Sequence, residues 1–284
     1  MTTFAFPGRA MKTAYAVPHL RRITLLAWVV LWFAPVLLAS SFHAVTISLR
    51  GVPESLAVYD PPAGTPRRPV QVIVTSGDLG WFGLSVDVAE YLQHQGYRVL
   101  GFSSRMYLSS FTGRKGRHLD AGQIPGDYRA LMDWAAAGSA FPKEFVLVGV
   151  SEGAGLSVMA VGQSGGPLPC RGTVTLGIPF HTALAWRWTD FPMWITKKEP
   201  NEPRVNTAEY LAHLSVPIAM IQSTRDEYNP IARARSLFAA AASPREFILV
   251  DAANHRFSNK RPEVMSDVSS SLEWIESLHP KESP

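Results

Sequence analysis

The sequence predicts an α/β fold in which a mostly parallel central sheet is flanked by helices. Short apolar runs typical of buried strands alternate with amphipathic segments typical of helices. The clearest alternation gives a strand over residues 70–75, a helix over 84–95 and a strand over 97–102. A second begins with the apolar run 145–150, which leads into a helical pattern of small residues from Gly153. Such alternation is typical of parallel strands, because each crossing helix returns the chain to the same edge of the sheet.

The remaining elements follow from the same patterns. Strands are expected over 44–49, 55–59, 172–178, 217–222 and 247–250, and helices over 124–137, 231–242 and 262–278. Residues 103–123 are expected to form a long loop. Residues 179–207 are expected to form an irregular insertion that carries four large aromatic residues, Trp186, Trp188, Phe191 and Trp194. This insertion is either a packed cap or a lid over an acyl group.

Composition is that of an ordinary globular protein with one large domain. The chain has 284 residues, of which 46% are hydrophobic, and a formal net charge of +4. That charge is too small to indicate a nucleic-acid partner. Cys170 is the single cysteine, so an intramolecular disulfide is excluded and no cysteine-based metal site is expected. We expect Cys170 to be a small buried or loop residue, and the sequence indicates no cofactor.

The N-terminal segment, residues 1–42, is expected to lie outside the globular domain, which occupies residues 43–284. Four basic residues occur before residue 23, and no acidic residue precedes Glu54. Residues 23–39 are apolar except for Thr24, and small residues follow. This pattern predicts either a cleavable signal peptide or a membrane anchor. The basic flank then places the domain outside the cytoplasm, in the periplasm or on the outer side of the cytoplasmic membrane.

The strand expected at 145–150 runs directly into Gly149-Val150-Ser151-Glu152-Gly153 at the start of a helix. A serine at such a strand-to-helix turn is typical of a nucleophile elbow, in which the hydroxyl is exposed above the sheet. Glycines two residues before and after the serine leave room for the turn. Ser151 is therefore the predicted nucleophile. The N-terminus of the following helix is expected to stabilise a developing oxyanion.

A second match to the same pattern, Gly162-Gln163-Ser164-Gly165-Gly166, serves as an internal comparison. It follows a helix instead of a strand and leads to Pro167, so it is interpreted as a helix end and a loop. The surrounding sequence therefore favours Ser151 over Ser164 as the nucleophile.

A base and an acid follow Ser151 at the ends of later strands. Asp226 and Glu227 follow the strand expected at 217–222, and His255 follows the last strand. In the α/β-hydrolase fold the catalytic triad occurs in the order serine, acid, histidine, on loops at the carboxyl ends of the strands. We therefore predict this fold, with His255 as the base and Asp226 as the acid. Glu227 could reach the same space, and a solvent-exposed loop carboxylate is the alternative for both acids.

Ser76-Gly77-Asp78 follows the strand at 70–75, where this fold places the loop that completes its oxyanion hole. The backbone N–H groups of Asp78 and Glu152 are the expected donors. A carboxylate is an unfavourable neighbour for a developing anion, so we expect the Asp78 side chain to turn toward the loop backbone.

Arg114, Lys115 and Arg117 form a basic cluster within the loop expected at 103–123. The cluster is either a solvent-exposed surface or a binding site for a substrate phosphate or an anionic membrane.

Four segments carry a resemblance to a known family. They are Ser76-Gly77-Asp78-x-Gly80-Trp81, Gly96-Tyr97-x-Val99-x-Gly101, Ser104-Arg105-x-Tyr107 and Gly149-x-Ser151-x-Gly153. Together they resemble the bacterial virulence protein VirJ and the related AcvB carboxyl-terminal domain, over roughly residues 70–275. The resemblance implies an exported α/β-hydrolase that acts on aminoacylated phosphatidylglycerol, with Ser151 as nucleophile and His255 as base. Where that family usually has Gly-Tyr-Ser-Phe-Gly-Ala-Asp, this chain has Glu152 for the phenylalanine and Gly155 for the aspartate.

Two functions are compatible with these observations. The first is an exported serine hydrolase that cleaves an ester, and the resemblance implies an anionic phospholipid substrate such as lysyl-phosphatidylglycerol. The second is an exported protein of the same fold that binds a partner or assists secretion without catalysis. A complete set of nucleophile, base and acid favours the first, because binding alone does not require these residues in this order.

Overall fold

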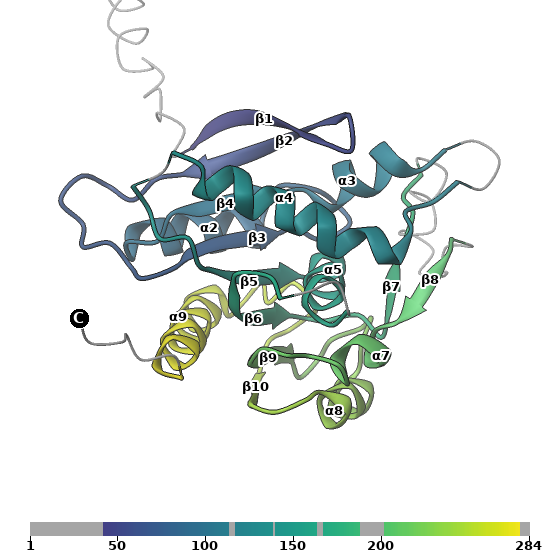
Figure 1. Ribbon diagram of the computed structural model, residues 1–284. Helices are drawn as coiled ribbons and strands as arrows, with labels where there is room; N and C mark the ends of the chain where they lie inside the picture. Colours follow the sequence, from purple (N-terminus) through teal and green to yellow (C-terminus); the bar gives the residue numbers. More distant parts are fainter. Residues whose placement is uncertain (1–41, 114–116, 139, 164–166, 188–201, 279–284) are drawn as a thin grey trace, which may run out of the picture. The chain divides into compact units, whose positions relative to one another are not determined.

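The computed structural model describes residues 42–113, 117–138, 140–163, 167–187 and 202–278 (Figure 1). Its strands are β1 (His43–Leu49), β2 (Val52–Tyr59), β3 (Gln71–Thr75), β4 (Val99–Phe102), β5 (Phe145–Val150), β6 (Cys170–Leu176), β7 (His181–Ala183), β8 (Arg204–Asn206), β9 (Ile218–Ser223) and β10 (Arg245–Val250). Its helices are α2 (Leu84–His94), α3 (Ser104–Phe111), α4 (Ile124–Ala136), α5 (Glu152–Val161), α7 (Thr207–Leu211), α8 (Ile231–Ala240) and α9 (Arg261–Ser277), with a short 3-10 helix η2 (Ala121–Gln123).

Within the described residues, one sheet of eight strands has the order β1-β2-β4-β3-β5-β6-β9-β10. β1 pairs with β2, and β2 with β4, in antiparallel fashion, whereas the other pairs are parallel. The predicted mostly parallel sheet flanked by helices is confirmed (Figure 1). Since the carboxyl ends of parallel strands share one edge, the segments that follow β3, β5, β9 and β10 are brought together there.

Helices cover both faces of this sheet. One apolar cluster joins Ile73 and Leu147 of the central strands to side chains of α4, α5 and α8. The other joins Val72 and Val148 to side chains of α2 and α9. Every residue of β3 and β5 is buried, as expected for strands with helices on both sides. The two strands that lead to the oxyanion loop and to Ser151 are therefore held rigidly at the centre of the core.

The loop predicted over residues 103–123 is wrong in its first part, because residues 104–111 form helix α3. The Ser103 hydroxyl accepts a hydrogen bond from the Met106 backbone N–H at 3.3 Å, which caps the first turn. Tyr107 and Leu108 are buried in the core beneath the helix. The serines in this stretch are typical of a loop sequence. One of them instead caps the helix, and packing of the buried face stabilises the helix.

The insertion predicted over residues 179–207 has a small antiparallel sheet, β7 with β8, at its base. The Leu119 N–H donates to the Leu184 carbonyl at 2.7 Å, which ties this base to the segment after α3. Trp186 packs against the core, and its ring lies 4.3 Å from the Arg105 guanidinium carbon. The other aromatic residues of the predicted cap, Trp188, Phe191 and Trp194, lie outside the described residues.

The basic and apolar N-terminal segment also lies outside the described residues, except for Phe42. Across the part of the chain that the structure describes, no helix combines the length and the apolar character needed to cross a bilayer.

Candidate active site

Ser151 occupies the sharp turn between β5 and α5. Its backbone has φ 51° and ψ −120°, a conformation that residues other than glycine rarely adopt. The two flanking glycines are required by close backbone approaches. A Cβ atom at Gly149 would lie 2.3 Å from the Ala154 Cα atom, and one at Gly153 would lie 2.3 Å from the Thr75 carbonyl oxygen. The two glycines of the Gly-x-Ser-x-Gly pattern therefore have a steric cause, whereas serine at 151 is held in a strained conformation.

His255 lies between Ser151 and Asp226, although the three residues are far apart in the sequence. The His255 Nε2 atom is 2.9 Å from the Ser151 Oγ atom, and the Nδ1 atom is 2.7 Å from Asp226 Oδ2. A carboxylate only accepts hydrogen bonds, so Nδ1 carries the proton. In the neutral imidazole Nε2 is then free to accept the hydroxyl proton of Ser151. This is the arrangement in which a histidine acts as a general base on a serine.

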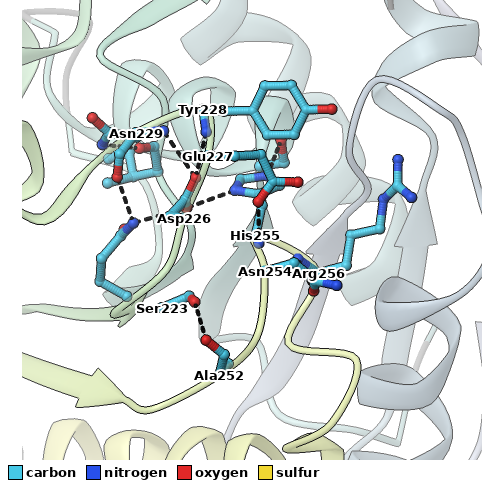
Figure 2. Close-up of polar contacts among 12 residues, drawn as sticks. Ser223, Asp226, Glu227, Tyr228, Asn229, Ala252, Asn254, His255 and Arg256 are labelled. Atoms are coloured by element: carbon cyan, nitrogen blue, oxygen red, sulfur yellow. Dashed lines mark hydrogen bonds and ion pairs between the residues drawn. The ribbon is translucent and has the colours of Figure 1, made fainter. Parts of the chain in front are cut away.

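Asp226 is fixed in place by backbone and side-chain donors (Figure 2). Its Oδ1 atom accepts the N–H groups of Tyr228 at 2.9 Å and Asn229 at 2.8 Å. Its Oδ2 atom accepts the Gln222 side-chain amide at 2.8 Å besides the imidazole. Burial alone would raise the pKa of Asp226, but the hydrogen bond and charge of His255 and the backbone donors hold this pKa below its ordinary value. Asp226 is therefore ionised at neutral pH.

Glu227 has a different partner from Asp226. Its Oε2 atom accepts the backbone N–H of His255 at 2.8 Å, and Figure 2 shows its carboxylate next to His255, which lies on the loop after β10. Of the two adjacent acids, Asp226 contacts the ring and Glu227 contacts the backbone of the same residue.

The two expected oxyanion donors belong to the residue after Ser151 and to the loop after β3. Glu152 is the first residue of α5, so its N–H has no acceptor within the helix. Gly77 lies close to Ser151, since a Cβ atom there would be 3.3 Å from the serine Cβ. Burial raises the pKa of Asp78, while His255, Arg256 and the N–H groups of Leu79 and Asp78 partly lower it. The Asp78 carboxyl thus lies against its own loop backbone.

The Glu152 side chain forms a contact that sequence reasoning missed. Its Oε1 atom accepts the backbone N–H of Ala183 in β7 at 2.5 Å. Burial raises the pKa of Glu152 to about 8. Gly155 faces the same strand, because a Cβ atom there would lie 2.0 Å from the Thr182 Oγ1 atom. Both positions at which this elbow differs from the resembling family therefore contact β7. The sequence of the insertion did not predict this three-residue strand, so the contact could not be predicted either.

The raised pKa of Glu152 predicts a pH-dependent stability. Between the ordinary glutamate pKa and about 8, the folded protein retains a proton that the unfolded chain releases, so the free energy of unfolding falls as pH rises. Glu152→Gln keeps an oxygen for the Ala183 N–H but does not titrate. We expect the free energy of unfolding of the variant, measured in urea, to exceed that of the wild type increasingly from pH 5 to pH 9. A difference that stays constant across this range would contradict the prediction.

The Ser151 hydroxyl faces a small pocket, here called the reactive pocket, with a volume of about 140 Å³. Its walls include Asp78, Phe82, Tyr228 and Arg256. The Tyr228 ring packs edge-on against the His255 ring with 5.2 Å between their centres. The predicted nucleophile and base are thus reached through an opening with aromatic side chains at its border.

Of the other predicted residues that the structure describes, Arg117 and Cys170 are not among those that line this pocket. Arg114 and Lys115 lie outside the described residues, and Arg117 is exposed, with its carbonyl accepting the Gly113 N–H at 3.1 Å. The Cys170 thiol donates to the Gly172 carbonyl at 3.2 Å, and burial raises its pKa to about 12, so it stays protonated. Among the residues that the structure describes, no cluster of three or more histidine, cysteine or acidic side chains could hold a metal ion.

Comparison with known sequences identifies relatives of this chain. Residues 70–164 match the family model described as "Bacterial virulence protein (VirJ)", a stretch that includes the loop after β3 and the elbow. The uncharacterized protein Rv2307c of Mycobacterium tuberculosis (strain ATCC 25618 / H37Rv) is 26% identical over 186 residues. The alignment covers 65% of this chain and 62% of that relative, so the chain spans less than two thirds of the relative's length.

Solved structures with the same fold include several esterases and a serine hydrolase homologue. Est1E from Butyrivibrio proteoclasticus is 12% identical with a TM-score of 0.60, covering 82% of this chain and 99% of that chain. The Pyrococcus furiosus esterase Pf2001 is 19% identical with a TM-score of 0.60, covering 82% and 91%. An alpha-beta serine hydrolase homologue from Coxiella burnetii is 17% identical with a TM-score of 0.56, covering 81% and 97%. The resemblance to the VirJ family is therefore confirmed over residues 70–164, in a chain whose fold is that of the α/β-hydrolases.

Proposed function

We propose that this protein is a serine ester hydrolase with Ser151 as nucleophile, His255 as general base and acid, and Asp226 as the residue that orients the imidazole. The observation that carries the proposal is the continuous hydrogen-bonded series Ser151–His255–Asp226 at the strained turn after β5. Strain at a half-buried serine, beside a base and a buried acid, is typical of acyl-transfer sites.

The chemistry follows from the positions of these atoms. His255 Nε2 takes the hydroxyl proton as Ser151 Oγ forms a bond to the ester carbonyl carbon. The resulting imidazolium then donates that proton to the leaving alcohol as the ester bond breaks, which leaves an acyl group on Ser151. A water molecule, deprotonated in turn by His255, hydrolyses the acyl-enzyme and restores the serine. Asp226 stabilises the imidazolium in both half-reactions without itself taking a proton.

The negative charge that develops on the carbonyl oxygen requires donors next to Ser151. The Glu152 N–H at the N-terminus of α5 is one donor in this proposal. The Asp78 N–H is the other once it exchanges its own carboxyl, which it contacts in the structure, for the oxyanion. The partial positive charge of the helix N-terminus adds to their effect. Proton retention by Glu152, whose pKa is raised by burial to about 8, keeps its carboxyl neutral beside this charge at neutral pH.

For the substrate we propose an aminoacylated phosphatidylglycerol, hydrolysed outside the cytoplasm. The match of residues 70–164 to the VirJ family and the basic, apolar N-terminal sequence support this choice. The test is incubation of the purified protein with vesicles that contain lysyl-phosphatidylglycerol, with release of lysine as the measurement. Lipid analysis of a deletion strain should show accumulation of the same lipid. A protein that binds these vesicles but releases no lysine, and that hydrolyses no simple ester, would support the non-catalytic alternative.

The basic cluster Arg114, Lys115 and Arg117 is expected to contribute to binding of an anionic lipid surface. Each cation near such a surface contributes about 1 kcal/mol. A triple alanine variant should therefore raise KM on anionic vesicles several-fold, whereas KM for the neutral ester p-nitrophenyl acetate should change far less. The difference between the variant and the wild type should shrink with added salt, because charges more than about 10 Å apart are screened at ~0.1 M. Equal losses on both substrates would show that the cluster has a structural role instead.

A further inference from the structure

A second pocket lies beside the loop of residues 76–81, next to the reactive pocket. Its volume is about 300 Å³, and its walls include Ala44, Ala57, Trp81 and Met106. Leu79 and Gly80 line both pockets, so this loop is their common wall. A ligand that extends from Ser151 over residues 79–80 would therefore enter the second pocket.

The strand register explains why this part of the sheet is hollow. Ala44 of β1 pairs with Ala57 of β2, and Ala57 pairs with Gly101 of β4, so three small residues lie side by side. The Trp81 ring covers the end of this row, because a Cβ atom at Gly101 would lie 2.2 Å from it. The Trp81 indole N–H donates to the Tyr59 hydroxyl at 3.2 Å, which holds the ring in place. The pocket thus has a preformed apolar floor and an aromatic wall.

The charged side chain at this pocket interacts with neighbouring protein groups, so the pocket does not favour an anionic headgroup. Arg105 lines it, but its guanidinium stacks on Trp186 and donates to the Leu79 carbonyl at 3.4 Å. Its charge is thereby directed toward the aromatic ring and the loop backbone. What remains at the pocket is mainly apolar surface, which favours an uncharged, apolar ligand.

Exposed apolar side chains gather at the openings of the two pockets. Met106, 54% exposed, lies at the second pocket, whereas Phe82, 56% exposed, and Tyr228, 43% exposed, lie at the reactive pocket. These are three of the five large apolar side chains that are exposed among the described residues. Concentration of exposed apolar surface around one site is typical of a surface that binds an apolar partner.

We infer that the second pocket binds an aliphatic chain of the ester substrate while the ester group itself occupies the reactive pocket. The inference rests on the proposed ester hydrolase function and adds the place at which an aliphatic chain of the substrate binds. Burial of each methylene group favours binding about fourfold. Three buried methylenes therefore suffice for a preference well above tenfold.

Two ester series test the inference with the full-length protein. In the first series the acyl chain is lengthened, from p-nitrophenyl acetate to p-nitrophenyl decanoate. In the second series the alcohol chain is lengthened, from ethyl acetate to hexyl acetate. We expect the wild-type kcat/KM to rise at least tenfold along one series, which also identifies the side of the ester that carries the chain. Ala44→Trp, which fills the pocket, and Met106→Glu, which places a charge at its opening, should lower that long-to-short ratio about tenfold.

Ser48→Trp is the matched control, because Ser48 is exposed on the same strand and face as Ala44 but lies away from the pocket. It should keep the wild-type ratio. A wild type with no preference for long chains, or an unchanged ratio in both pocket variants, would overturn the inference.

A direct binding measurement separates the pocket from the chemistry. Ser151→Ala protein should bind the uncharged probe 1-decanol, as measured by titration calorimetry, and adding Ala44→Trp should weaken that binding at least tenfold. Probe binding without ester hydrolysis by the wild type would contradict only the proposed function, whereas hydrolysis without probe binding would contradict only the pocket.

Discussion

Ser151→Ala is expected to lower kcat for ester hydrolysis by about 10⁶-fold, the loss typical of removing the serine from a triad. The substitution removes the Ser151 Oγ atom, which lies 2.9 Å from His255 Nε2 and is the bond-forming nucleophile. Alanine tolerates φ 51° about as well as serine does, so stability should hardly change. The measurements are kcat on p-nitrophenyl acetate, covalent labelling by a fluorophosphonate probe, and the melting temperature.

Ser164→Ala is the matched control, because it removes a hydroxyl from the second Gly-x-Ser-x-Gly match in the same chain. Ser164 itself lies outside the described residues. The variant should retain both activity and probe labelling. Labelling that persists in Ser151→Ala and disappears in Ser164→Ala would show that the nucleophile has been assigned to the wrong serine.

Asp226→Asn is expected to lower kcat by about 10⁴-fold. It should also lower stability, because the Gln222 amide that donates to Oδ2 at 2.8 Å would then face another NH₂ group. The asparagine oxygen should remain toward the backbone N–H groups of Tyr228 and Asn229, which need an acceptor. The amide NH₂ then faces His255 Nδ1, where the carboxylate oxygen accepted a proton. The imidazole must present a lone pair at Nδ1 and carry its proton on Nε2, so it can no longer accept the proton of Ser151.

Glu227→Gln provides the comparison for this loss. A glutamine oxygen can still accept the His255 backbone N–H that Glu227 accepts at 2.8 Å. Even complete loss of one hydrogen bond to a charged group costs only about 1.5 kcal/mol. The kcat of this variant should therefore fall less than about tenfold. Rates for both variants are best measured across pH 6–9 on the same ester. If Glu227→Gln were the more damaging change, Glu227 would be the acid that supports the imidazole.

The placement of Ser151 and His255 could be predicted because it depends on chain order and on strand ends. Parallel strands bring their carboxyl ends to one edge, so residues that follow β5 and β10 meet there whatever their separation in sequence. The choice between Asp226 and Glu227 could not be made in this way. It depends on the turn at 226–229, whose N–H groups bind Asp226 and direct it toward the ring.

Other features were beyond sequence reasoning for a different physical reason. The second pocket arises from the register of three strands, which places Ala44, Ala57 and Gly101 in one row. No local pattern of hydrophobicity encodes that row, because each small residue belongs to a different strand. Helix α3 was missed because its apolar contacts are tertiary and its local composition is typical of a loop.

The contacts of Glu152 and Gly155 with β7 mean that the elbow and the base of the insertion cannot diverge independently. A phenylalanine at 152, the residue usual in the resembling family, would leave the Ala183 N–H without its acceptor. A side chain at 155 would collide with Thr182. A chimera that keeps this elbow but replaces β7, or keeps β7 but replaces the elbow, would therefore lose the Glu152 contact or create the clash at residue 155.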